Sequence, residues 1–85
     1  TLVWVGANEV VRIDSARQFA SRYPDQESSA EIYTNPDPLP YVELEMLGPL
    51  HRMIVGDKIS RTSMYTLLRR AERDPDLEVQ RLAVP

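Results

Sequence analysis

The sequence predicts an all-β, mainly antiparallel fold that ends in a short helix, and three observations lead to this prediction. Apolar and polar residues alternate at every second position through residues 30–34 and 41–47, which is typical of half-buried strands. Turn-forming residues separate these runs from their neighbours. The last stretch, residues 75–82, opens with the proline and acidic residues that favour the start of a helix.

Two strands joined by a turn are predicted at the start of the chain. Residues 2–5 (LVWV) and 9–14 (EVVRID) are rich in β-branched and aromatic side chains, and the turn-prone GAN lies between them. Residues 15–23 leave two interpretations open, because Phe19 and Tyr23 would share one face of either a strand or a helix. The PDQESS segment that follows is a loop by composition.

Prolines separate the two central strands. Residues 30–34 alternate cleanly, and the NPDPLP segment that follows ends this strand, because proline lacks the amide donor of a sheet ladder. The next strand, residues 41–47, places Val42, Leu44 and Met46 on one side, and Gly48 and Pro49 stop it. A further turn is predicted at residues 56–57.

The segment from 59 to 70 fits two secondary structures. Four of its residues have the spacing of a helix face, whereas an overlapping set fits a strand face almost as well. The helix-spaced set is Met64, Leu67, Leu68 and Ala71, and the strand-spaced set is Ile59, Ser63, Tyr65 and Leu67. After it, residues 72–85 are predicted to form a helical tail whose helix runs from about 75 to 82, with Asp74 as the N-cap and Pro75 in the first helical position.

Length and composition limit the classes of protein to which the chain belongs. With 85 residues, it is either a single domain or the C-terminal fragment of a larger β-sandwich, since its strands need a second layer. We therefore expect it to associate with the remainder of a parent chain or with a second copy. Lysine and arginine number 10 against 13 acidic residues, so nucleic acid is not expected as a partner. The apolar runs are too short to span a membrane, and a chain without cysteine points to the cytoplasm.

No cofactor and no metal ion are expected. The chain has three glycines, and none has the spacing of a phosphate-binding loop. His51 is the single histidine and has no cysteine or second histidine to form a metal site with it.

The candidate site residues are Glu43, Glu45 and Tyr41, which would share the polar side of the 41–47 strand. Two carboxylates on one strand face can hold sugar hydroxyls, and partial burial would raise the pKa of one of them enough for acid or base chemistry. The alternative is an ordinary solvated sheet face, and the spacing alone leaves both interpretations open.

The run from Tyr23 to Leu68 resembles the C-terminal part of the DUF4380 family, uncharacterised proteins related to the galactose mutarotase-like sandwiches. The resemblance rests on four quoted segments, YPD, AEIYTN, YVELEMLGPL and VGD followed by MYTLL, which occur in the family's order and at similar spacing. ELE with LGPL is the specific part.

The resemblance implies a fragment of a β-supersandwich whose concave face binds a carbohydrate, with Glu43 and Glu45 facing the ligand and Tyr41 beside them. It also implies that residues 58–68 form a strand rather than a helix. Under this hypothesis the chain is a carbohydrate-binding segment, and the resemblance suggests an aldose epimerase-like enzyme as its parent protein. The alternative hypothesis is a structural module without a ligand that completes a sheet or dimerises.

Overall fold

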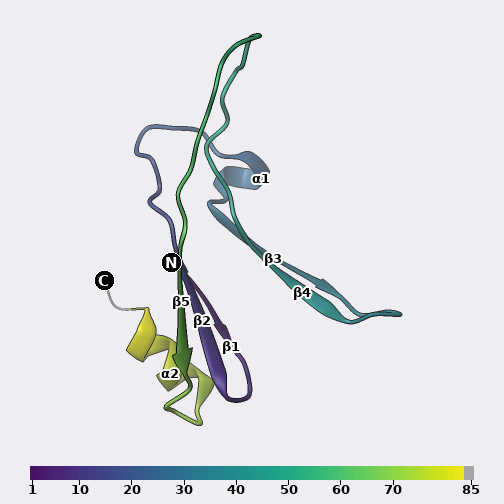
Figure 1. Ribbon diagram of the computed structural model, residues 1–85, viewed down its shortest axis with the longest axis vertical. Helices are drawn as coiled ribbons and strands as arrows, with labels where there is room; N and C mark the ends of the chain where they lie inside the picture. The colour runs from purple at the N-terminus through teal and green to yellow at the C-terminus, as the bar shows by residue number, and fades with distance from the viewer. Residues whose placement is uncertain (84–85) are drawn as a thin grey trace. The chain divides into compact units, whose positions relative to one another are not determined.

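The computed structural model describes residues 1–83 and divides the chain into two compact units (Figure 1). Unit 1 is built from Thr1–Ser15 and from the chain after Ser63, and unit 2 is Ala16–Thr62. Each unit contains its own antiparallel sheet, and the described part of the chain contains more strand than helix. The predicted all-β, mainly antiparallel fold class with a short C-terminal helix is confirmed.

Unit 1 is a three-stranded antiparallel sheet with the order β1-β2-β5. Its strands are β1 (Leu2–Val5), β2 (Glu9–Asp14) and β5 (Met64–Arg69). The turn between β1 and β2 is closed by the Gly6 amide, which donates to the Glu9 carbonyl at 2.8 Å. Both predicted N-terminal strands and their turn are confirmed, and β2 is the central strand because it pairs on both edges.

For the segment from 59 to 70 the helical interpretation is wrong, and the strand interpretation is right for residues 64–69, which form β5. Residues 64–69 are extended and pair with β2, so the helical spacing does not decide the structure. The strand is also shorter than the 58–68 predicted from the resemblance, since residues 58–63 are not in a sheet. The ladder between β2 and β5 ends at the pair of Asp14 with Met64.

The core of unit 1 is small and includes one buried charge. Leu2, Val10, Ile13 and Leu82 are its buried apolar side chains. Leu82 belongs to α2 (Pro75–Leu82), which contacts β1. The helix begins as predicted, with Asp74 as the N-cap, whose Oδ1 accepts from the Asp76 amide at 2.9 Å. The predicted helical tail also included residues 84 and 85, which lie outside the described residues.

Glu78 is the buried charge, and it ties α2 to the loop before it. Its Oε2 accepts from the amides of Ala71 at 2.5 Å and Glu72 at 3.2 Å. Its Oε1 accepts from Arg81 Nε at 2.6 Å. The hydrogen bond from Arg81, together with the two amides, lowers the pKa of Glu78 although burial acts in the opposite direction. The carboxylate is thus satisfied in its charged form.

Unit 2 is built around a two-stranded antiparallel hairpin of β3 (Ala30–Asn35) and β4 (Tyr41–Met46). The proline-rich segment 36–40 connects the two strands, with a cis peptide bond between Asp37 and Pro38. Both strands were predicted, and the structure confirms them with nearly the predicted bounds.

The segment before the hairpin differs from both predictions made for it. Residues 15–23 form neither a strand nor a helix. The predicted loop after them contains one short turn, α1 (Pro24–Glu27), in which Asp25, Gln26 and Glu27 all have positive φ. This left-handed conformation is unfavourable for residues with a Cβ atom and needs support from other contacts.

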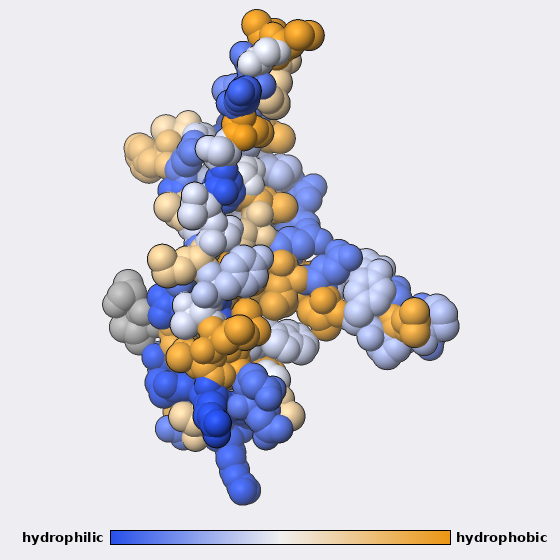
Figure 2. Space-filling model, viewed as in Figure 1, coloured by the Kyte–Doolittle hydropathy of each residue, from blue (hydrophilic) through white to orange (hydrophobic). Residues whose placement is uncertain are grey.

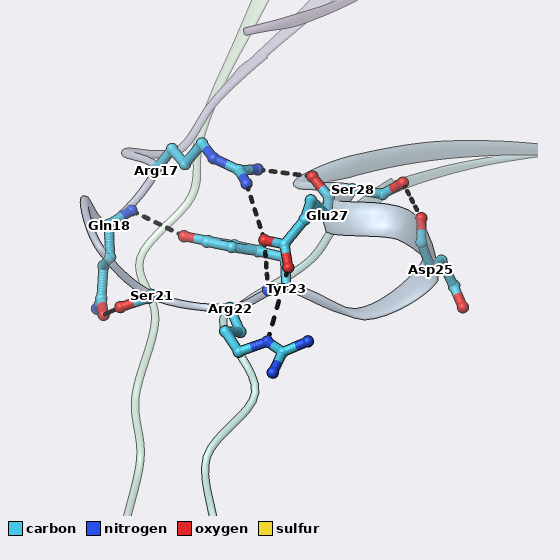
Figure 3. Close-up of polar contacts among 8 residues, drawn as sticks. All are labelled: Arg17, Gln18, Ser21, Arg22, Tyr23, Asp25, Glu27 and Ser28. Atoms are coloured by element: carbon cyan, nitrogen blue, oxygen red, sulfur yellow. Dashed lines mark hydrogen bonds and ion pairs between the residues drawn. The ribbon is translucent and has the colours of Figure 1, made fainter.

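The support comes from Glu27 and Tyr23, which Figure 3 shows in contact with Arg17. The Glu27 carboxylate accepts from the Tyr23 amide at 3.0 Å, and its Oε2 lies 3.5 Å from Arg17 Nη2. The Arg17 guanidinium also lies over the Tyr23 ring, 4.1 Å from the centroid. Tyr23 is the buried aromatic residue of this unit, so the turn is anchored by a packed ring and an ion pair.

A long segment without strands, residues 47–62, completes unit 2. The predicted turn at residues 56–57 is confirmed, because the Asp57 amide donates to the Ile54 carbonyl at 3.0 Å. Ile54 and Val55 are exposed beside this turn. Figure 2 shows apolar side chains at the far end of this segment. Across residues 1–83, no helix has both the length and the apolar character required to cross a membrane.

We predict that Glu78→Gln destabilises unit 1 near neutral pH and that this effect fades in acid. The lowered pKa of Glu78 stabilises the folded state above the ordinary glutamate pKa of about 4.3, and the stabilisation is lost as the pH falls through the folded-state value. Thermal melts followed by circular dichroism from about pH 7 to about pH 3 measure this. Glu72→Gln, an exposed neighbour, is the matched control; a gap from wild type that stays constant with pH would contradict the prediction.

Candidate functional site

The polar face of the β3-β4 hairpin is the candidate site (Figure 1). Antiparallel pairing places Glu31 opposite Glu45, Tyr33 opposite Glu43, and Asn35 opposite Tyr41. Side chains alternate between the two faces of a strand, so these six residues share one face and Ile32, Thr34, Val42 and Leu44 share the other. The polar face is Glu31, Tyr33, Asn35, Tyr41, Glu43 and Glu45.

One end of the polar face is aromatic. The rings of Tyr33 and Tyr41 lie with their centroids 5.9 Å apart and their planes tilted by 37°. The Tyr33 hydroxyl donates to Asn35 Oδ1 at 3.2 Å, and Asn35 Nδ2 donates to the Leu39 carbonyl at 2.9 Å. Tyr33 is 43% exposed and Tyr41 is 48% exposed, so both side chains are open to a ligand.

The other end of the polar face is acidic. Glu43, exposed and two residues along the same strand, raises the pKa of Glu45 through a shared hydrogen bond and through its charge, and partial burial of Glu45 adds to the shift. The carboxyl of Glu45 therefore holds its proton to a higher pH than an isolated glutamate does.

A third and a fourth carboxyl group join this cluster. Asp25, from the left-handed turn α1, raises the pKa of Glu31 by a hydrogen bond and by its charge, and burial and the charge of Glu45 act in the same direction. One oxygen of Glu31, Oε1, is buried and has no hydrogen-bond partner within residues 1–83. Like charges facing across a sheet destabilise it, so protonation relieves this end of the hairpin.

The arrangement provides donors and acceptors next to an apolar ring surface. A carboxyl group that keeps its proton donates a hydrogen bond, and an ionised neighbour accepts one. A hydroxyl group of a polyol needs both, and the flat C–H surface of a sugar packs against aromatic rings. The face is therefore suited to a neutral, hydroxyl-rich ligand and disfavours an anion.

The hollow at the tip of the hairpin reaches only part of the predicted site. This cavity of about 330 Å³ is lined by Thr34, Asn35, Pro36, Pro40, Tyr41 and Val42. Tyr41 is thus at the edge of a cavity, whereas Glu43 and Glu45 lie farther along the open face of the hairpin. In the described part of the chain, no three histidine, aspartate or glutamate side chains are placed to hold a metal ion.

Sequence reasoning missed half of this face. The predicted residues were Tyr41, Glu43 and Glu45, and the structure adds Glu31, Tyr33, Asn35 and the nearby Asp25. The alternation in residues 30–34 already placed Glu31 and Tyr33 on one side of a strand. The missing step was the hairpin register, which would have set those side chains opposite the glutamates of β4.

Comparisons with known proteins add no relative: no family model, no curated protein and no solved structure matches the chain. The resemblance to the DUF4380 family therefore stays a prediction.

We predict that Glu43→Gln lowers the pKa of Glu45 toward its ordinary value, because the neighbouring Glu43 carboxyl is the main cause of the shift. A carboxyl-carbon NMR titration of the whole chain reads each glutamate separately. The raised pKa of Glu45 destabilises the folded state as the pH rises through it, so the variant should also gain stability relative to wild type near neutral pH. Glu9→Gln, exposed in unit 1, is the control, and an unchanged Glu45 titration would contradict the prediction.

Proposed function

We propose that the polar face of the β3-β4 hairpin binds a carbohydrate or a similar polyol. The observation that carries the proposal is the placement of two half-exposed tyrosine rings, 5.9 Å apart, on the same face of the hairpin as Glu43 and Glu45, of which Glu45 has a raised pKa. Tyr33 and Tyr41 form the surface on which a sugar ring packs, and Glu43 and Glu45 exchange hydrogen bonds with its hydroxyl groups.

The proposal concerns ligand binding. The resemblance to mutarotase-like sandwiches is the reason to test aldoses first as ligands. A carboxyl group with a raised pKa, such as that of Glu45, is suited to proton transfer at a sugar hydroxyl, as an aldose epimerase-like enzyme would require. The cytoplasmic location expected for a chain without cysteine is part of the same proposal.

We expect calorimetric titration of the whole chain with galactose and glucose to show saturable binding that depends on this face. Tyr41→Ala and Glu45→Gln should each weaken binding by about tenfold, because each removes a ring contact or a charge-assisted hydrogen bond. Ile32→Ala changes an exposed residue on the opposite face of the same hairpin, outside the cavity beside Tyr41, and should leave the affinity unchanged. Equal affinities for wild type, Glu43→Gln and Glu45→Gln would refute the assignment.

A second candidate function is a structural one, and the open face of the unit 1 sheet favours it. Register places Trp4, Val11 and Leu67 in one row across the three strands, with Tyr65 next to Leu67 on the same face. Leu67 is 76% exposed and Tyr65 is 65% exposed. Figure 2 shows apolar side chains at the position of β5. This apolar face, together with the free edge of β5, would pair with a second copy of the chain or with the remainder of a parent chain.

Sedimentation velocity tests the structural candidate. If the apolar face joins two copies, the wild-type chain should sediment as a dimer at high concentration, and Leu67→Lys should shift it to the 9.7 kDa monomer, because a buried lysine is costly at an interface. Leu39→Lys, in unit 2 and 74% exposed, is the matched control and should not change the assembly. A folded wild-type monomer at every concentration would count against self-association.

A further inference from the structure

Unit 2 contains a cavity that is separate from the polar face of the hairpin. Its volume is about 470 Å³, within the range of small-molecule sites. Its walls combine apolar, hydroxyl, amide and basic side chains and contain no carboxylate. The lining residues are Gln18, Gly48, Pro49, His51, Ile59, Ser60 and Arg61.

Three segments that are distant in the sequence form this cavity, and hydrogen bonds hold them together. Gln18 comes from the loop before α1, residues 48–51 follow β4, and residues 59–61 precede β5. The Leu50 amide donates to the Arg22 carbonyl at 2.7 Å, and Arg61 Nη2 donates to the Ala16 carbonyl at 3.0 Å. The cavity is therefore part of the folded unit and not a gap between two free loops.

Arg61 is the charged group of this cavity, and its charge is not paired. Its Nε is buried and has no hydrogen-bond acceptor in the described part of the chain. Arg12, Arg17 and Arg81 each have a carboxylate partner, whereas among residues 1–83 Arg61 forms no ion pair. Arg61 lines the cavity and has no carboxylate partner, so its guanidinium is available to an anion in that cavity.

The neighbourhood of Arg61 keeps the cavity electropositive. The Tyr23 hydroxyl accepts from the Gln18 amide at 2.7 Å. Burial raises the pKa of this hydroxyl, but that hydrogen bond and the nearby Arg61 and Arg17 guanidinium groups outweigh burial and lower it. The lowered pKa is the effect expected of the positive charges of Arg61 and Arg17 on this hydroxyl.

We propose that the cavity binds a small organic acid through its carboxylate. The planar guanidinium of Arg61 pairs with the carboxylate, and the His51 imidazole and Ser60 hydroxyl provide further donors. Pro49 and Ile59 contact the apolar body of the ligand. The inference is independent of sugar binding at the hairpin, since it uses different residues and a ligand of opposite chemistry.

The experiment is an amide NMR titration of the labelled whole chain with benzoate, which combines a carboxylate with an apolar ring. We expect saturable shifts at Gly48, Ser60 and Arg61, including the Nε–H signal of Arg61. Benzyl alcohol tests the charge, because it keeps the ring and lacks the carboxylate, and it should not bind. Inorganic phosphate tests the apolar contacts and should bind more weakly than benzoate; equal or tighter binding of either control would overturn the proposal.

Variants make the test specific. Arg61→Gln should weaken benzoate binding by about tenfold or more, as expected for the loss of a charge-assisted pair. Arg52→Gln removes the same charge from an exposed residue that does not line the cavity, and it should have no effect. Because Arg61 also bonds Ala16, His51→Ala serves as a second variant at an exposed position and should weaken binding several-fold. Equal affinities for His51→Ala and wild type, or equal losses for Arg61→Gln and Arg52→Gln, would overturn the proposal.

Discussion

The antiparallel register between β3 and β4 is the constraint on which the candidate site depends. It places Glu31 opposite Glu45 and Tyr33 opposite Glu43, and so gathers acids and rings on one face. A slip of one residue would move every side chain of one strand to the other face. The Asn35 side chain, which bonds the carbonyls of Asp37 and Leu39 in the connecting segment, helps to fix this register at the closed end.

The acidic end of the hairpin lowers the stability of unit 2. Carboxyl groups that face each other repel when ionised, and a two-stranded hairpin alone has little stability to spare. Hydrogen bonds to the neighbouring carboxyl groups of Asp25 and Glu43, together with burial and the charges of these neighbours, raise the pKa of Glu31 and of Glu45. The tyrosine pair and the bond from the Leu47 amide to the Ser29 carbonyl, at 3.0 Å, stabilise the two ends.

Charged side chains differ between the two units in whether their hydrogen-bonding groups have partners. Glu78 in unit 1 is buried and fully bonded by Arg81 and two amides, so it is a structural carboxylate that the fold keeps ionised. Arg61 in unit 2 is a cation with a buried donor that no described residue accepts from, and the pKa of Glu45 on the polar face is raised by its acidic neighbour Glu43. A satisfied charge holds a fold together, whereas an unsatisfied one at a surface or cavity is available to a ligand.

The sequence alone determined the features that depend on neighbouring residues. Strict alternation defined β3 and β4, prolines set the break between them, and Asp74 with Pro75 marked the start of α2. These signals act within a few residues, so no other part of the chain is needed to interpret them.

Tertiary structure decided what local patterns left ambiguous or did not encode. Leu67 and Leu68 have helical spacing with Met64, yet they are extended because pairing with β2 satisfies their backbone groups. The cavity around Arg61 and the hydrogen bond from Arg61 to the Ala16 carbonyl require segments that are far apart in the sequence to meet. Contacts between residues that are far apart in the sequence leave no pattern among neighbouring residues, so periodicity cannot predict them.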